Sequence, residues 1–281
     1  MAEMTSRERL TCLFNGGVPD RMGSTFLINP YFTNSLPGKP DPLDLMKELG
    51  ADILDRDCPL PYEKKYSGGV SYEEVYKNGE TQRIFTTPVG TVYESYAGKM
   101  AWGDIPFKKE SYIKTPEDYK ILQYVFEPTA FVPNYDWFEE RDRALGDHGI
   151  VVPQATEFRS SLEYLFEDNI ERTIFDMADY PEIVGEFLQT LKEKNIEATK
   201  IAAESPAQVF NIWEDSSTTL LSPALFEEYV LPEFAEFTKI INGDGKKRIH
   251  HACGHIKDLL QMMETEQVAA FESLTPAGTG N

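Results

Sequence analysis

The sequence has few cysteines, and it contains no long apolar run. Its three cysteines stand far apart at Cys12, Cys58 and Cys253, which gives no disulfide framework and indicates a reducing compartment. No stretch approaches the roughly 18–20 apolar residues of a membrane span. The N-terminus lacks the basic-then-apolar order of a signal peptide. These absences predict a cytoplasmic protein with no membrane partner.

Positive charge is also scarce. The 281 residues include 27 lysines and arginines against 47 aspartates and glutamates, a net charge of −20. Such a chain cannot neutralise phosphates over a broad basic face, so we expect no nucleic-acid partner and no docking on anionic lipid. The hydrophobic fraction of 41% and the charged fraction of 26% are ordinary for a folded globular protein.

The pattern of apolar residues alternates between strand and helix, which predicts a parallel sheet covered by helices. Six main-sheet strands are expected, near residues 24, 52, 151, 209, 249 and 269. Ser6 is expected to cap a first helix that Gly16 and Gly17 end. Further helices are expected at 41–49, from 115 onward, and at 160–169, 170–179, 181–203, 222–242 and 256–264.

Residues 70–98 have a different character. Aromatic and β-branched residues alternate there with polar ones, and Asn78-Gly79 is a strong hairpin turn. We expect an antiparallel insertion that is not part of the main sheet.

The number of expected main-sheet strands, six, leaves two folds open. A (β/α)₈ TIM barrel needs eight strands, but only ten residues follow Phe271, and they end in Gly278-Thr279-Gly280-Asn281. One interpretation is a single barrel domain over residues 1–281 that lacks about two C-terminal βα units, roughly 60 residues. The alternative is an open, doubly wound sheet that is complete as it stands.

Polar and titratable residues follow the expected strands, where a barrel places its chemistry. They are, in chain order, Asn29, Tyr31, Asp55, Arg56, Asp57, Cys58, Gln154, Glu157, Arg159, Trp213, Glu214, Asp215, His251, Cys253, His255, Glu272 and Thr275. The sequence contains no Gly-rich phosphate loop and no nucleophile elbow.

The strongest local pattern lies at residues 248–255, which hold three of the four histidines. His251 and Cys253 point the same way on a strand, so they can share one Zn²⁺. A catalytic zinc needs a third protein ligand, which His255, Glu272 or a residue beyond the chain's end could supply. The alternative is that Cys253 packs in the core and the backbone satisfies the histidines.

Three other clusters each allow two interpretations. Asp55, Arg56 and Asp57 suit either acid–base chemistry or an ion pair at the rim. Trp213 and Asp215 suit either binding of a planar ligand or a core tryptophan followed by a helix cap. Glu157 and Arg159 are expected to pair at the rim.

The sequence resembles the uroporphyrinogen decarboxylase-like superfamily in several motifs spread along nearly the whole chain. They are TSRERL at 5–10, PDR at 19–21, GAD at 50–52, TPVGT at 87–91, SPALFEEYVLP at 222–232, HACGH at 251–255 and ESLTP at 272–276. The resemblance implies a (β/α)₈ barrel with further strands after the last motif.

Two activities follow from the resemblance. One is methyl transfer from a methylated corrinoid protein to a thiol or a folate. Its thiol-acceptor branch holds zinc by His-x-Cys and a distant cysteine. His251 and Cys253 match that motif, but no cysteine follows Cys253. A zinc-bound thiol is deprotonated at neutral pH and is then nucleophilic.

The other activity is cofactor-independent decarboxylation of uroporphyrinogen. The resemblance places Asp57 near the family's catalytic aspartate and Tyr164 near its active-site tyrosine. The true decarboxylases hold their many substrate carboxylates with an arginine-rich stretch after the first strand. This chain has no arginine between Arg21 and Arg56.

We therefore expect a zinc-assisted, corrinoid-linked methyltransferase acting on a small-molecule substrate. His251, Cys253 and Glu272 are its candidate metal ligands, and the candidate substrate-binding residues are Asn29, Gln154, Trp213 and Asp215. Two alternatives remain, a decarboxylase of a carboxylic acid that uses Asp57 and Tyr164, and a non-catalytic binding module. A corrinoid protein is the expected partner, and the sequence leaves a homodimer open.

Overall fold

The computed structural model describes residues 3–98 and 107–274, and its central feature is a run of parallel strands. β1 (Ile53–Asp55) pairs with β8 (Gly149–Val151), and β9 (Val209–Glu214) pairs with β10 (Lys247–Ala252), which pairs with β11 (Ala270–Glu272). A parallel bridge from Gln154 to Asn211 joins the two groups. The parallel strands thus lie side by side in the order in which they occur in the chain, as in a barrel.

The barrel is not closed in the part of the chain that the structure describes. β1 and β11 form the two edges, and no strand pairing joins them there. The fold is therefore an α/β arrangement of the barrel type with an open sheet. Residues 275–281 lie outside the described residues, so the expected C-terminal truncation stays a prediction, and the ESLTP motif is described only as far as Leu274.

The strand expected near residue 24 is absent, and this prediction is wrong. Ser24 accepts one backbone hydrogen bond from Asp52 at 2.7 Å, but the segment has no strand pairing. Asn29 instead caps a short helix, α2 (Pro30–Asn34), by accepting a hydrogen bond from Phe32 N. Proline at the first helical position and an asparagine cap favour this helix start.

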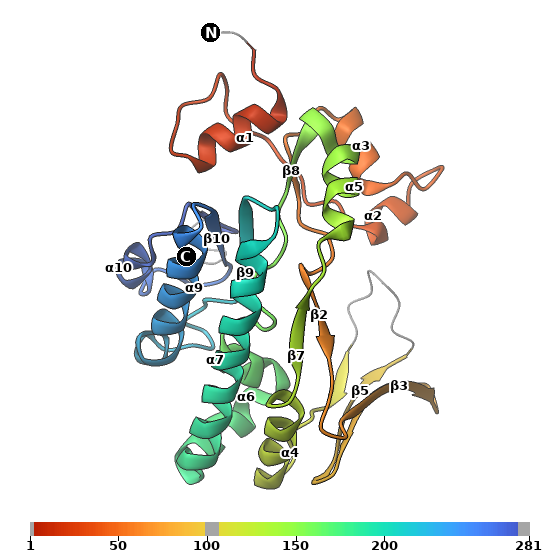
Figure 1. Ribbon diagram of the computed structural model, residues 1–281, viewed down its shortest axis with the longest axis vertical. Helices are drawn as coiled ribbons and strands as arrows, with labels where there is room; N and C mark the ends of the chain where they lie inside the picture. The colour runs from red at the N-terminus through yellow and green to blue at the C-terminus, as the bar shows by residue number, and fades with distance from the viewer. Residues whose placement is uncertain (1–2, 99–106, 275–281) are drawn as a thin grey trace.

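Helices cover the sheet and account for most of the remaining chain (Figure 1). Thr5, not the expected Ser6, caps α1, because its hydroxyl forms a capping box with Glu8. The two helices expected at 160–179 form one element that bends at Asn169, whose φ is −163°. The helix expected at 222–242 is interrupted by a π-helical turn at Phe226–Val230. The helices are α1 (Ser6–Phe14), α3 (Pro42–Glu48), α4 (Pro116–Phe126), α5 (Asp136–Leu145), α6 (Ser161–Asp179), α7 (Pro181–Glu204), α8 (Pro223–Leu225), α9 (Leu231–Gly243) and α10 (Leu260–Met263).

The segment expected to be antiparallel forms a sheet of its own beside α4 (Figure 1). Its strands are β3 (Ser71–Lys77), β4 (Glu80–Thr87), β5 (Gly90–Ala97) and β6 (Lys108–Glu110). Asn78 and Gly79 form the hairpin turn with φ of 55° and 81°. Phe85 and Val92 join the main hydrophobic core, so the insertion packs against the helices. A second antiparallel pair, β2 (Tyr62–Lys65) with β7 (Ala130–Pro133), was not expected from the sequence.

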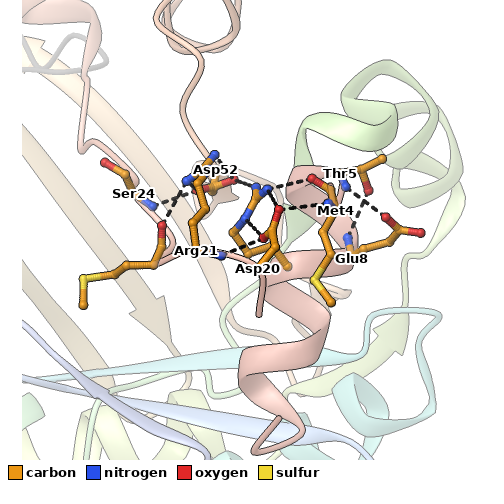
Figure 2. A network of polar contacts seen from close by, with 9 residues as sticks. Met4, Thr5, Glu8, Asp20, Arg21, Ser24 and Asp52 are labelled. Carbon is orange, nitrogen blue, oxygen red and sulfur yellow. Dashed lines mark hydrogen bonds and ion pairs between the residues drawn. The ribbon is translucent and has the colours of Figure 1, made fainter. Parts of the chain in front are cut away.

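Three of the family-like motifs meet in one ion-pair network around the buried side chains of Arg9 and Asp52 (Figure 2). Arg9 of α1 contacts Asp20 at 2.7 Å and Asp52 at 2.5 Å, and Arg21 contacts Asp52 at 2.7 Å. Asp52 also accepts a hydrogen bond from Ser24 N at 2.8 Å. The network fastens the N-terminal segment to the start of β1. No helix among the described residues is both long and apolar enough to cross a membrane.

Candidate active site

The register of three neighbouring strands brings the candidate metal residues together. His251 of β10 lies opposite Trp213 of β9 and opposite Glu272 of β11. The β9–β10 pairing ends with Ala252 opposite Glu214, so the next residues, Cys253 and Asp215, emerge side by side. Because side chains alternate along a strand, His251 and Cys253 share a face with Asp215.

Asp215, His251 and Cys253 form a compact group of possible metal ligands, which we call the ligand cluster. One ligand atom from each residue lies within 4.8 Å of the others. The Cys253 thiol donates a hydrogen bond to Asp215 Oδ1 at 2.7 Å. Oxygen, nitrogen and sulfur donors of this kind are the ones that zinc accepts in proteins. The donor set therefore fits the metal that the resemblance implies, with Asp215 in place of a second cysteine.

Glu272 lies beside the cluster and not in it. Its carboxylate is 2.8 Å from His251 Nδ1, and it also accepts a hydrogen bond from Asn211 at 2.9 Å and pairs with Arg56. A carboxylate on the second ring nitrogen is the usual way to fix the orientation of a metal-binding histidine. Glu272 therefore lies where it could orient His251, and Asp215 is the candidate third ligand.

Arg159 holds Asp215 in place from the other side. Its guanidinium lies 2.6 Å from Asp215 Oδ2 and 2.5 Å from Glu163 Oε1. Glu163 also accepts a hydrogen bond from the backbone N–H of Asp215 at 2.8 Å. Both the side chain and the backbone of Asp215 are therefore fixed before any ligand binds.

Burial and neighbouring groups shift the pKa values of the titratable residues in and near the ligand cluster. Burial raises the pKa of the Cys253 thiol to about 12, and its hydrogen bond to Asp215 acts in the same direction. Burial also opposes ionisation of Asp215, but its bonds with Cys253 and Arg159 lower its pKa overall. Behind them, burial and the neighbouring Glu163 raise the pKa of Glu214 well above its ordinary value, which favours its protonated form.

A large cavity of about 930 Å³ opens beside the ligand cluster, and nine of its 17 lining residues are aromatic. We call it the aromatic cavity. Trp213 and Arg159 line this cavity and also contact the cluster. The ring centroids of Trp213 and His251 are 4.6 Å apart, and Arg159 pairs with Asp215. Gln154 and Tyr164, two other predicted site residues, line the same cavity.

The remaining predicted residues lie elsewhere. Asp57 is exposed and lines a separate pocket of about 160 Å³ together with Asp55 and Arg141. Asn29 is an exposed helix cap. The expected rim pair of Glu157 and Arg159 does not form, because Glu157 pairs with Lys64 at 2.6 Å. His255 is exposed and is not among the cluster residues.

Sequence reasoning missed two features of this region. One is the aromatic wall that β2, β3 and β4 add to the cavity, which the alternating tyrosines at 62–76 could have suggested. The other is a buried chain of contacts on the opposite face of β10. His250 Nε2 lies 3.0 Å from Ser216 Oγ, and Nδ1 lies 2.9 Å from Glu266. His250 and Ser216 are fully buried, so this chain serves to hold the residue next to Asp215.

Comparisons with known proteins bear on the family and the fold of this chain. The sequence profile of the uroporphyrinogen decarboxylase (URO-D) family matches residues 161–273, a range that includes the ligand cluster and Glu272. Among solved structures, a methyltransferase from Methanosarcina mazei superposes with a TM-score of 0.57 at 13% sequence identity, over 96% of this chain and 76% of that one. A comparison with curated proteins finds no match. The resemblance of this chain to the uroporphyrinogen decarboxylase-like superfamily is thus confirmed by a family match over residues 161–273 and by a shared fold.

Proposed function

We propose that the chain is a methyltransferase of this superfamily that moves a methyl group from a methylated corrinoid protein to a thiol or folate acceptor. The observation that carries the proposal is the ligand cluster, in which Asp215, His251 and Cys253 meet at the ends of β9 and β10 beside a large cavity. The superfamily match includes these residues, and the M. mazei methyltransferase has a similar fold.

The proposed zinc ligands are Asp215, His251 and Cys253. Zinc bound there would lower the pKa of an acceptor thiol, so that the reactive thiolate exists at neutral pH. Glu272 would accept a hydrogen bond from the Nδ1–H of His251 and so leave Nε2 as the ligand atom. Arg159 and the backbone bond to Glu163 keep the Asp215 carboxylate aimed at the other two ligands.

The aromatic cavity gives a small substrate access to this centre. Trp213 forms part of its wall and contacts His251, so a ligand on the Trp213 face lies next to the cluster. Gln154 offers amide groups at the same wall. Both residues suit the substrate-binding role predicted from their positions at strand ends.

The decarboxylase alternative gains little from the geometry. Its two candidate catalytic residues, Asp57 and Tyr164, line different cavities. The three basic residues that line the aromatic cavity are Lys64, Arg83 and Arg159, and each is already paired with a carboxylate. A polycarboxylate substrate would therefore meet no uncommitted cation in the lining of this cavity.

The test is the zinc content and methyl-transfer activity of the purified protein beside the Cys253→Ala variant. Methylcobalamin serves as methyl donor and a small thiol as acceptor. We expect near-stoichiometric zinc and activity in the wild type, with both lost in Cys253→Ala. The matched control is Cys12→Ala, because Cys12 is a part-buried free cysteine of α1, far along the chain from the cluster.

Two results would overturn parts of the proposal. If the purified wild-type protein contains no metal, the proposed activation of a thiol by zinc is wrong. If Cys253→Ala still transfers methyl groups, the ligand cluster takes no part in the reaction.

A further inference from the structure

We propose that the aromatic cavity binds an alkylated ammonium cation. This inference goes beyond the proposed methyl transfer and rests only on the lining of the cavity. Three observations support it, namely the ring faces, the charge of the lining and two buried polar atoms without partners.

The ring faces come from two groups of contacting aromatic residues. The first group lies on and beside the inserted sheet, where Phe85 is 5.1 Å from Tyr72 and 5.6 Å from Tyr112, centroid to centroid. The second lies on the barrel side, where Phe158 is 5.1 Å from Phe126 and 4.7 Å from Tyr164. Both groups line the same cavity. Aromatic faces attract a cation within about 6 Å of the ring centroid, and more strongly when water is excluded.

The charge of the lining is negative. Four carboxylates, Glu63, Glu94, Glu157 and Glu167, line the cavity against three basic residues. Two of the basic residues also pair with acidic groups outside the lining, since Arg83 contacts Glu74 at 3.0 Å and Arg159 contacts both Glu163 and Asp215. In the other direction, Glu63 and Glu94 pair with Lys65 and Lys108 outside the lining. With these neighbours included, carboxylates still outnumber basic groups around the cavity. The surroundings of the cavity therefore favour a ligand of positive charge over an anion.

Two buried atoms of the lining lack partners among the described residues. Glu157 Oε1 pairs with Lys64, but Oε2 has no hydrogen-bond partner, although the side chain is only 6% exposed. Tyr62 Oη also lacks a partner, and Tyr62 is 3% exposed. Buried polar groups are normally satisfied, so an unpaired carboxylate oxygen here indicates a missing positive or donor group.

The aromatic walls distinguish an alkylated ammonium from a bare metal cation. A hydrated metal ion prefers oxygen ligands, whereas alkyl groups around a positive nitrogen pack against ring faces. A neutral hydrocarbon would fill the same space, but it would leave Glu157 Oε2 without a positive partner. The combination of ring faces and excess carboxylate thus favours an organic cation.

The test compares two probes of nearly equal shape, choline and its uncharged carbon analogue 3,3-dimethylbutan-1-ol. Binding to the full chain is measured by calorimetry and by tryptophan fluorescence, since Trp213 lines the cavity. We expect choline to bind at least about tenfold more tightly than the neutral analogue. No metal, corrinoid or methyl acceptor is present, so the result does not depend on the proposed reaction.

Two variants separate the ring face from the tyrosine hydroxyl. Tyr72 is 42% exposed, so its replacement does not open a buried hole. We expect Tyr72→Leu to weaken choline binding several-fold and Tyr72→Phe to leave it close to wild type, with little effect of either on 3,3-dimethylbutan-1-ol. Glu157→Gln should also weaken choline selectively.

Equal affinity for the two probes, or binding of neither, would overturn the proposal. Preferential binding of benzoate or phenol would also overturn it, and would assign the cavity to an anionic or a neutral aromatic ligand. Absence of choline binding in a zinc-loaded, active enzyme would refute this inference and leave the proposed methyl transfer standing.

Discussion

Arg9 and Asp52 are 43 residues apart in the chain and form an ion pair of 2.5 Å between two almost fully buried side chains. Both belong to motifs by which the sequence resembles the uroporphyrinogen decarboxylase-like superfamily, as do Asp20 and Arg21, which complete the network (Figure 2). These motif residues lie beside the start of β1, whereas the ligand cluster follows the ends of β9 and β10. Their role in this structure is to fasten the N-terminal segment.

The first prediction is that Asp52→Asn lowers the free energy of unfolding by about 2–3 kcal/mol. The substitution removes one of the two carboxylates that pair with the buried Arg9 guanidinium and leaves only Asp20 as its charged partner. Urea denaturation measures the loss. The matched control is Asp142→Asn, which breaks the Arg7–Asp142 pair, whose side chains are about one-third exposed. That change should cost no more than about 1 kcal/mol. Equal losses in the two variants would contradict a special role for the buried network.

The second prediction concerns acid stability. The hydrogen bond from Arg9, helped by that from Met4 N, lowers the pKa of Asp20 below its ordinary value of 3.8. Because the folded pKa is depressed, the stabilisation is complete above pH 3.8 and is lost as the pH falls toward the folded pKa. The stability difference between wild type and Asp20→Asn should therefore be largest near neutral pH and shrink below about pH 4. Urea denaturation over this range checks it, and a difference that does not change with pH would refute it.

Much of the barrel-type sheet could be predicted because its signals are local. The strands at 209–214 and 247–252 are short apolar runs that end in polar residues, and both are present with their functional residues at the carboxyl ends. The turn at Asn78-Gly79 is likewise encoded by two adjacent residues that accept positive φ. His251 and Cys253 could be paired from the two-residue strand period alone.

Sequence patterns are less informative where distant pairing decides the outcome. The sequence offers Glu272 as a third ligand on residue type, whereas the strand register sets Asp215 beside Cys253 and Glu272 beside His251, so the choice of third ligand stays a prediction. β2 and β7 are about 65 residues apart, and neither strand is recognisable without the other. Residues 23–29 look like a strand, but the asparagine cap and proline that follow start a helix.

The third prediction is that Glu272→Gln weakens zinc binding by about 10–100-fold without removing the site. The amide keeps the shape of the side chain but loses the charge that fixes the proton of His251 on Nδ1. Competition with a zinc chelator measures the affinity. Glu171→Gln is the control, because Glu171 is exposed on α6. Affinity that is unchanged in Glu272→Gln would show that Glu272 does not orient the ligand.

The fourth prediction concerns Gly254, which follows Cys253. Its φ is +99°, and a Cβ there would lie 2.5 Å from the Cβ of Ser217. The same loop is tied to Ser217 through His255, whose N–H donates to Ser217 Oγ at 3.1 Å. An alanine at 254 would therefore push Cys253 and the segment after Asp215 apart.

Gly254→Ala should lower the free energy of unfolding by about 1–3 kcal/mol and weaken zinc binding at the same time. The control is Gly185→Ala, since Gly185 lies inside α7 and a Cβ there meets no atom within 4 Å. The free energy of unfolding of that variant should rise by about 0.5–1 kcal/mol, because alanine has a higher helix propensity than glycine. Its zinc affinity should equal that of the wild type. Thermal melts and chelator competition on the two variants give both readouts. Loss of stability in Gly254→Ala with unchanged zinc affinity would mean that Cys253 is not a ligand, because the strain is applied directly next to it.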